Sequence, residues 1–170
     1  RTGAFCNEVA MFSITLLCMG KLKEKFYTAA AEEYSKRLRA FADFRIVELP
    51  EYRLPDDPNE TQIAQGLARE AEAIRKTIPK GAWLCVLTPE GRLLSSEELA
   101  SALHSVKTGG KSAACFLIGS SFGIDPSIKA MADLKLSMSK MTFPHHLARV
   151  MALEQLYRAE AIQAGSKYHK

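Results

Sequence analysis

The sequence of 170 residues predicts one α/β domain whose parallel β-sheet is covered by helices on both faces. Three observations lead to this fold class. Short apolar runs alternate with longer segments of helical periodicity, as strands do when crossover helices join them. The runs are largely apolar throughout, which is typical of strands buried on both faces of a sheet. The length suits a single core, and no internal repeat or low-complexity linker divides the chain.

Five apolar runs are expected to form the strands. The first run ends at Gly20, and the second is closed by Pro50. A polar turn at residues 88–91 follows the third run, and the fourth leads into a glycine-containing loop. The fifth run alternates apolar and polar residues, with the period of a strand. The expected strands span residues 13–19, 44–49, 82–87, 113–118 and 134–138.

Helices are expected between these strands and after the last one. Apolar residues recur at three- and four-residue steps from Leu22 to Phe41, which predicts the first helix. The second is expected to have Asp57 as its N-cap and Pro58 at its first position, and to reach about residue 78. Three further start signals predict the rest: a capping box of Ser95 and Glu98 for a helix to Val106, Asp125 with Pro126 for a short helix to about Asp133, and Pro144 for a long helix to about Gln163.

The composition is that of an ordinary globular protein with a mild positive charge. Apolar residues make up 47% and charged residues 25%, and the net charge is +4, which suits a polyanionic partner without requiring one. Basic residues outnumber acidic ones between residues 21 and 45, and this segment is either a solvated helix surface or a nucleic-acid patch. The basic residues there are Lys21, Lys23, Lys25, Lys36, Arg37, Arg39 and Arg45.

The cysteines and the N-terminal segment indicate the cellular compartment of the protein. Cys18, Cys85 and Cys115 lie in apolar runs without metal-ligand or redox spacing, where a thiol behaves as a small hydrophobe. This favours a reducing compartment, so we expect a cytoplasmic protein. The apolar stretch 11–19 is too short to cross a bilayer, and no membrane association is expected. Residues 1–12 are expected to be an N-terminal extension to a single domain of residues 13–170.

Ligands of parallel sheets bind beyond the carboxyl ends of the strands. In the C-terminal half, the loops 88–91, 119–123 and 139–143 leave those ends, and we expect a small-molecule site between them. The last loop combines serine and threonine with Met138, Met141 and Phe143, which suits an adenine held by backbone hydrogen bonds in an apolar slot.

The helix that follows this loop carries candidate polar contacts. His145 and Arg149 are four residues apart near the partly positive helix N-terminus, so they share a face and can meet an anionic substrate together. The plainer alternative is a strand end, a cap and surface histidines. The same helix has apolar residues on more than one stripe, which predicts packing on the sheet and either a second subunit or the N-terminal segment on the other side.

Residues 119–123 (GSSFG) also fit the G-x-S-x-G pattern of a hydrolase nucleophile elbow, with Ser121 as the nucleophile. Aspartates and histidines follow in the order that such an enzyme needs. Against this interpretation, the domain is small for an α/β-hydrolase, and no oxyanion segment is recognisable. Asp125 is also explained as a helix cap. A small serine hydrolase that uses Ser121 therefore stays an alternative.

Three long segments together resemble the RlmH family of SPOUT-class methyltransferases, over about residue 13 to the C-terminus. The first is FLIGSSFG at 116–123, and the second is ADLKLSMSKMTFPHHLARV at 132–150. The third is LEQLYRA at 153–159, with YHK at 168–170. The second and third segments are far more specific than any G-x-S-x-G match.

The resemblance implies a SPOUT-type parallel sheet flanked by helices, with a C-terminal trefoil knot. It also implies S-adenosyl-L-methionine as the cofactor, bound without a metal. Carried over motif by motif, the cofactor-binding residues are Leu87, Gly119, Met138, Ser139, Lys140, Met141, Thr142 and Phe143.

The activity implied is methyl transfer to N3 of a pseudouridine in 23S ribosomal RNA of the assembled ribosome. The family assigns no general base, and His145 and His169 are candidates. The residues expected to hold RNA are Arg149, Arg158, Tyr168 and His169. The small domain fits a homodimer in which the C-terminal tail of one subunit completes the site of the other.

One position departs from the family pattern, because Ser120 stands where relatives commonly carry a second glycine. A side chain there is expected to narrow the cofactor pocket or to add a hydroxyl group to it. This departure leaves a further alternative, a dimeric RNA- or nucleotide-binding protein without catalysis.

Overall fold

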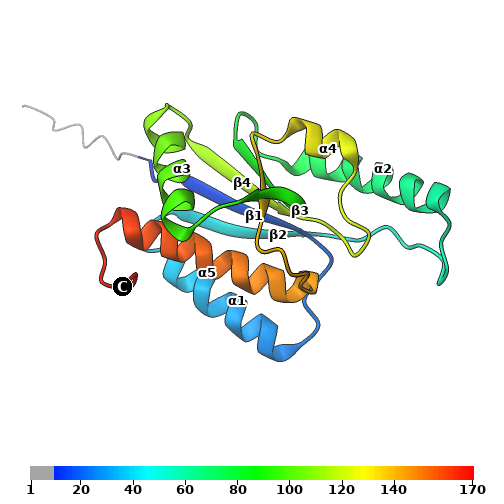
Figure 1. Cartoon of the computed structure of the whole chain (residues 1–170), viewed down its shortest axis with the longest axis horizontal. Helices are drawn as coiled ribbons and strands as arrows, with labels where there is room; N and C mark the ends of the chain where they lie inside the picture. Colours follow the sequence, from blue (N-terminus) through cyan, green and yellow to red (C-terminus); the bar gives the residue numbers. More distant parts are fainter. Residues whose placement is uncertain (1–9) are drawn as a thin grey trace, which may run out of the picture.

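The computed structural model describes residues 10–170, which form the predicted five-stranded sheet with helices on both faces (Figure 1). All neighbouring strands are parallel, in the order β2-β1-β4-β3-β5. The predicted α/β class is therefore confirmed. The strands are β1 (Ser13–Met19), β2 (Asp43–Leu49), β3 (Trp83–Leu93), β4 (Ala113–Ile118) and β5 (Leu134–Ser137).

Five helices divide between the two faces of the sheet (Figure 1). The first face is covered by α1 (Lys25–Leu38), α3 (Ser96–Thr108) and α5 (His145–Gln163), and α5 packs against both of the others. The second face is covered by α2 (Glu60–Thr77) and α4 (Pro126–Met131). No helix among the described residues is long and apolar enough to cross a membrane.

Alternate residues of the central strands fill two hydrophobic clusters, one under each helical layer. In β1, Leu16 faces the cluster beneath α1, α3 and α5, whereas Leu17 faces the cluster beneath α2 and α4. In β4, Phe116 and Leu117 divide in the same way. Burial on both sides explains why these runs are apolar without alternation.

The cysteines of the central strands are buried, as the sequence predicts. Burial raises the pKa of Cys18 and of Cys115 to about 12, so both thiols stay protonated at neutral pH. The sequence predicts an N-terminal extension at residues 1–12, and residues 1–9 of it lie outside the described part of the chain. Phe12 packs against the core, and its carbonyl accepts a hydrogen bond from the Asp43 amide.

One helix start differs from the sequence prediction. The N-cap of α2 is Asn59, not Asp57, and Pro58 precedes the helix. The Asn59 side chain accepts a hydrogen bond from the Gln62 amide (2.9 Å), and the Gln62 side chain accepts one from the Asn59 amide (3.0 Å). This reciprocal pair satisfies two amides at the helix N-terminus and fixes the start of the helix at Asn59. The predicted capping box of Ser95 and Glu98 is confirmed.

The expected turn at residues 88–91 is also wrong, because β3 continues through it to Leu93. Leu136 of β5 is paired with Leu87 before this stretch and with Arg92 after it, with a register shift between them. A Cβ atom at Gly91 would lie 2.6 Å from the backbone carbonyl carbon of Leu136. Residues 88–91 therefore pass directly against the backbone of β5, and only a glycine fits at the closest point.

We predict that Gly91→Ala lowers the free energy of unfolding by about 1–3 kcal/mol, because the methyl group would force two backbones apart. Urea unfolding monitored by the fluorescence of Trp83 measures this. Gly81→Ala is the control, since Gly81 has φ +76° but open space around it, so it reports backbone strain alone. Gly91 has no positive φ, so a Gly91→Ala variant as stable as the wild type would show that the close approach costs nothing.

Candidate functional site

A cavity of about 390 Å³ lies at the carboxyl ends of β4 and β5, beside the middle of β3 at residues 87–89. Its walls are the three loops that the sequence singled out, together with the start of α5. All eight residues predicted to bind a cofactor line this cavity: Leu87, Gly119, Met138, Ser139, Lys140, Met141, Thr142 and Phe143. The fold therefore brings them together, while their contact with a cofactor stays a prediction.

The loop after β4 is a tight reversal that has little room for side chains. A Cβ atom at Gly119 would lie 2.4 Å from Ile124 and 2.5 Å from the Gly123 carbonyl oxygen. The Gly123 amide donates to the Ser120 carbonyl (2.9 Å), and Gly123 has φ +96°. These two glycines keep the floor of the cavity close to the end of β4.

Ser120 lines the cavity, but its hydroxyl group is engaged with a buried carboxylate. It donates to Glu70 Oε2 at 2.9 Å, and Glu70 Oε1 accepts from the Tyr52 amide at 2.9 Å. Burial raises the pKa of Glu70, and the hydrogen bonds from Tyr52 and Ser120 act in the opposite direction. Glu70 thus ties the loops after β2 and β4 to α2. Sequence reasoning missed it, because it lies in an ordinary charged stretch of a helix.

The third-strand loop is fixed on the other side of the cavity. Glu90 accepts hydrogen bonds from Lys129 and Thr88, and both of these line the cavity. The Lys129 ammonium group, followed by the Thr88 hydroxyl, lowers the pKa of Glu90 to about 2, so this carboxylate is ionised at physiological pH. The pair connects the loop to α4 across the cavity rim.

The loop after β5 is ordered by its own serines. The Ser137 hydroxyl donates to the Ser139 carbonyl (2.9 Å), and the Met141 amide donates to Ser139 Oγ (3.0 Å). Met141 is 75% exposed, which makes it the most exposed large apolar residue in the described chain. The loop therefore presents hydroxyl groups and apolar surface at the cavity, as the sequence predicts.

Two histidines stand at the start of α5. His145 lines the cavity, and its Nε2 lies 3.6 Å from Glu51 Oε1. His146 Nδ1 lies 3.0 Å from Glu24 Oε2. Burial lowers the pKa of His145, and the neighbouring His146 lowers it further. His145 is therefore mostly neutral at neutral pH and has a ring nitrogen that can accept a proton.

Arg149 does not share an open face with His145, which corrects the sequence prediction. Its side chain is 1% exposed, with Nη1 bonded to Glu48 (3.1 Å) and Nη2 bonded to the Gly20 carbonyl (2.9 Å). It holds the start of α5 against the ends of β1 and β2. Because the Arg149 side chain is buried between α5 and these strand ends, it is not available to RNA in this structure.

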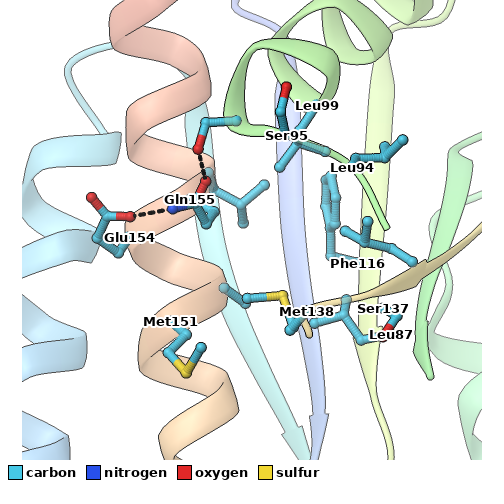
Figure 2. Close-up of a pocket in the computed structure, with 14 residues that line it drawn as sticks. Leu87, Leu94, Ser95, Leu99, Phe116, Ser137, Met138, Met151, Glu154 and Gln155 are labelled. Atoms are coloured by element: carbon cyan, nitrogen blue, oxygen red, sulfur yellow. Dashed lines mark hydrogen bonds between the residues drawn. The ribbon is translucent and has the colours of Figure 1, made fainter. Parts of the chain in front are cut away.

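A second cavity, of about 400 Å³, lies between α3 and α5 (Figure 2). It shares Leu87, Ser137 and Met138 with the first cavity, so these residues form a partition between the two. Its main polar group is the amide of Gln155, which accepts from Ser96 (2.6 Å) and donates to Glu154 (2.7 Å). With that amide satisfied, the cavity offers mainly apolar surface.

The other residues predicted to hold RNA gather at the far end of α5. Arg158 donates to Glu154 Oε1 at 2.6 Å, and the Tyr168 hydroxyl donates to the same oxygen at 3.1 Å. His169 lies 3.2 Å from Arg158 and 2.8 Å from Glu97. Arg158, Tyr168 and His169 therefore form one cluster, apart from His145 and the first cavity.

The hydrolase alternative receives no support from the geometry. Ser121 is exposed and has no histidine within hydrogen-bonding distance among the described residues. His145, His146 and His169 are each directed to a glutamate instead. The described residues contain no group of three or more His, Cys, Asp or Glu side chains that would hold a metal ion.

Comparisons with known proteins agree with the motifs. A family model described as "Predicted SPOUT methyltransferase" matches residues 12–169. Proteins named "Ribosomal RNA large subunit methyltransferase H" from Moorella thermoacetica and Acetivibrio thermocellus are each 44% identical to this chain. The matches cover 94% and 92% of this chain and 100% and 99% of the relatives. A protein of the same name from Bifidobacterium adolescentis is 45% identical, over 92% of this chain and 99% of its own length.

We predict that Ser120→Ala lowers the free energy of unfolding by about 1–3 kcal/mol, because the buried Glu70 carboxylate loses a hydrogen-bond donor. Urea unfolding near neutral pH measures this. Ser121→Ala is the matched control, as the neighbouring serine is exposed, and it should change stability by less than about 0.5 kcal/mol. A Ser120 variant as stable as the control would mean that the hydroxyl group does not support Glu70.

Proposed function

The chain belongs to the RlmH family of SPOUT methyltransferases, and we propose that it transfers a methyl group from S-adenosyl-L-methionine to N3 of a pseudouridine in 23S ribosomal RNA. The proposed substrate is the assembled ribosome. The relatives named above are large-subunit ribosomal RNA methyltransferases, which supports this substrate class. The proposed place of action is the cytoplasm, where ribosomes are.

One observation carries the proposal: the three loops converge on one cavity, and that cavity contains every predicted cofactor residue. Its volume falls in the range of small-molecule sites. Apolar side chains such as Met138 and Phe143 stand beside the backbone of Leu87 and the hydroxyl groups of Ser139 and Thr142. This combination fits an adenosine bearing a short amino-acid chain. The bound cofactor supplies an electrophilic methyl group on a sulfonium centre.

The work left to the protein is to align the reactants and to exclude water. The loop containing Gly119 and Gly123 forms a close-fitting floor, and the Glu90–Lys129 pair holds the opposite rim. N3 of the base loses a proton during transfer, so an acceptor near the cavity assists the reaction. Of the two candidate bases, His145 is favoured because it lines the cavity, whereas His169 is bonded to Glu97 at the other end of α5.

The position of the tail cluster supports a homodimer. Arg158 and Tyr168 are bonded to Glu154, nine residues after His145 on α5, which is about 14 Å along the helix. Arg158, Tyr168 and His169 do not line the cavity of their own subunit. In the proposed dimer, the tail of each subunit reaches the cavity of its partner, where the Tyr168 ring can stack on RNA.

The chain path supports the proposed trefoil knot. β5 is paired with β3 both before and after residues 88–91, through Leu87 and Arg92. Between these two residues, Gly91 lies in close contact with the backbone of Leu136. A C-terminal segment that passes through this loop before α5 would produce the knot, and the same passage would hold the three cofactor loops together.

The proposed activity is tested by incubating the protein with methyl-labelled S-adenosylmethionine and ribosomes from a strain that lacks its own enzyme. We expect label in 23S ribosomal RNA, on N3 of a pseudouridine when the digested RNA is analysed by mass spectrometry. Ribosomes from the parent strain are the control, because a position that is already methylated accepts no label. Label at another atom, or none on either ribosome, would contradict the proposal.

We predict that His145→Gln lowers kcat about 100-fold, while cofactor affinity changes little, because the variant lacks a proton acceptor. Since the pKa of His145 is lowered, protonation inactivates the wild type only below that pKa. The wild-type kcat should therefore rise with pH through a pKa below the ordinary value of 6.5, and the variant should lose this acidic limb. The pH profile of kcat at saturating cofactor, measured for the wild type and the variant, tests this prediction. A variant that keeps the same limb would exclude His145 as the base.

A further inference from the structure

The segment that joins β1 to α1 is exposed and basic and lies beside the cavity; with Lys25, the first residue of α1, we call residues 21–25 the basic loop. Lys21, Lys23 and Lys25 are all exposed, and none of them forms an ion pair with another described residue. The acidic residue between them, Glu24, is bonded to His146. Because the loop leaves the carboxyl end of β1, its lysines lie on the same edge of the sheet as the cavity.

A row of four rings leads from this loop to the cavity. Phe26, in the first turn of α1, is 66% exposed, and its ring centroid lies 4.4 Å from that of Tyr27. Tyr27 meets His146 edge-on at 6.2 Å, and His146 meets His145 at 4.3 Å. His145 lines the cavity. We call Phe26, Tyr27, His146 and His145 the aromatic row.

We propose that the basic loop and the aromatic row form a docking surface for a single-stranded segment of the ribosomal RNA next to the target nucleotide. The proposal rests on the proposed function and names the part of the same subunit that holds its substrate. Lysines neutralise phosphates, and exposed rings stack on unpaired bases, which is the usual chemistry of single-strand recognition. The row ends at the cavity, so a strand bound along it would bring the next base to the methyl donor.

Charge favours RNA over a second copy of this chain as the occupant. A two-fold interface centred on the loop would bring the same three lysines of two subunits together, and like charges in an interface oppose association. A polyanion gains from all three. The exposed Phe26 is also explained, since a base stacked on it would remove its ring from water. The basic segment that the sequence left undecided between a solvated face and a nucleic-acid patch is thereby assigned at its N-terminal end.

Two variants test the surface. In the first, Lys21, Lys23 and Lys25 are all changed to Gln, and in the second Phe26 is changed to Ala. The matched control changes Lys76, Lys80 and Lys111 to Gln. These substitutions remove the same charge, but from the opposite edge of the sheet, before β3 and β4. The measurements are anisotropy of a short fluorescein-labelled oligouridine as a function of salt, methylation of ribosomes, and S-adenosylhomocysteine affinity by calorimetry.

We expect the triple lysine variant to bind the oligouridine with a salt slope smaller by about 2, and to show a raised KM for ribosomes. Phe26→Ala should bind it roughly tenfold or more weakly. The control should match the wild type, and cofactor affinity should stay unchanged in all variants. A wild type that methylates ribosomes while both test variants behave like the control would overturn the inference alone. A wild type that does not methylate would instead contradict the proposed function.

Sedimentation of each variant separates RNA docking from subunit contact. If the surface binds RNA, Phe26→Ala keeps the oligomeric state of the wild type. A shift to a smaller species would place Phe26 in an interface between copies and would overturn its assignment to RNA.

Discussion

The close passage of β5 against residues 88–91 is the constraint on which the rest of this structure depends. With no side chain at Gly91, the two backbones approach closely, and Leu136 is paired with Leu87 on one side and Arg92 on the other. β5 therefore ends next to residues 88–91 of β3, and β4 ends beside both. Three loops that are far apart in the sequence meet at one edge, and their meeting creates the cavity. A Cβ atom at Gly119 would collide with Ile124 and with the Gly123 carbonyl, so a glycine is also required at the end of β4.

Buried charged groups hold the surroundings of the cavity in position. Arg149 joins α5 to β1 and β2, and Glu70 joins α2 to the loops after β2 and β4. Removing one partner of a buried ion pair typically costs about 3–5 kcal/mol, because the other charge is left without compensation. Ser120 takes part in this scaffold while it also lines the cavity. Its hydroxyl group joins the loop after β4 to Glu70, and a glycine at this position could not make that bond.

Much of the fold follows from the sequence, because burial on both faces leaves a direct signature in the strands. The runs around Leu16 and Phe116 are apolar throughout, and the glycines and capping residues mark most of the boundaries. The start of α2 was misplaced because Asp57, Pro58 and Asn59 all suit a helix start, and only the reciprocal bond to Gln62 decides between them. The path of residues 88–91 was also unpredictable, since a glycine in a turn and a glycine beside another strand look alike.

The convergence of the three loops on one cavity was predictable for a different reason. Their residues lie in continuous motifs, and parallel strands deliver loops to one edge whatever the details of packing. The burial of Arg149 could not be predicted, because helical spacing from His145 says nothing about which side of α5 faces the sheet. The buried position of Glu70 could not be predicted, because a charged residue in an amphipathic helix is usually solvated. Its two partners also come from distant loops.

The central claim is that the three converging loops form the cofactor site, and a crystal structure of the protein with S-adenosylhomocysteine tests it most directly. The account predicts ligand density in the cavity bounded by residues 87–89, 119–123 and 138–143, with the adenine beside Leu87 and the Met138–Phe143 loop. Density in the cavity between α3 and α5, or at any site away from these loops, would contradict it.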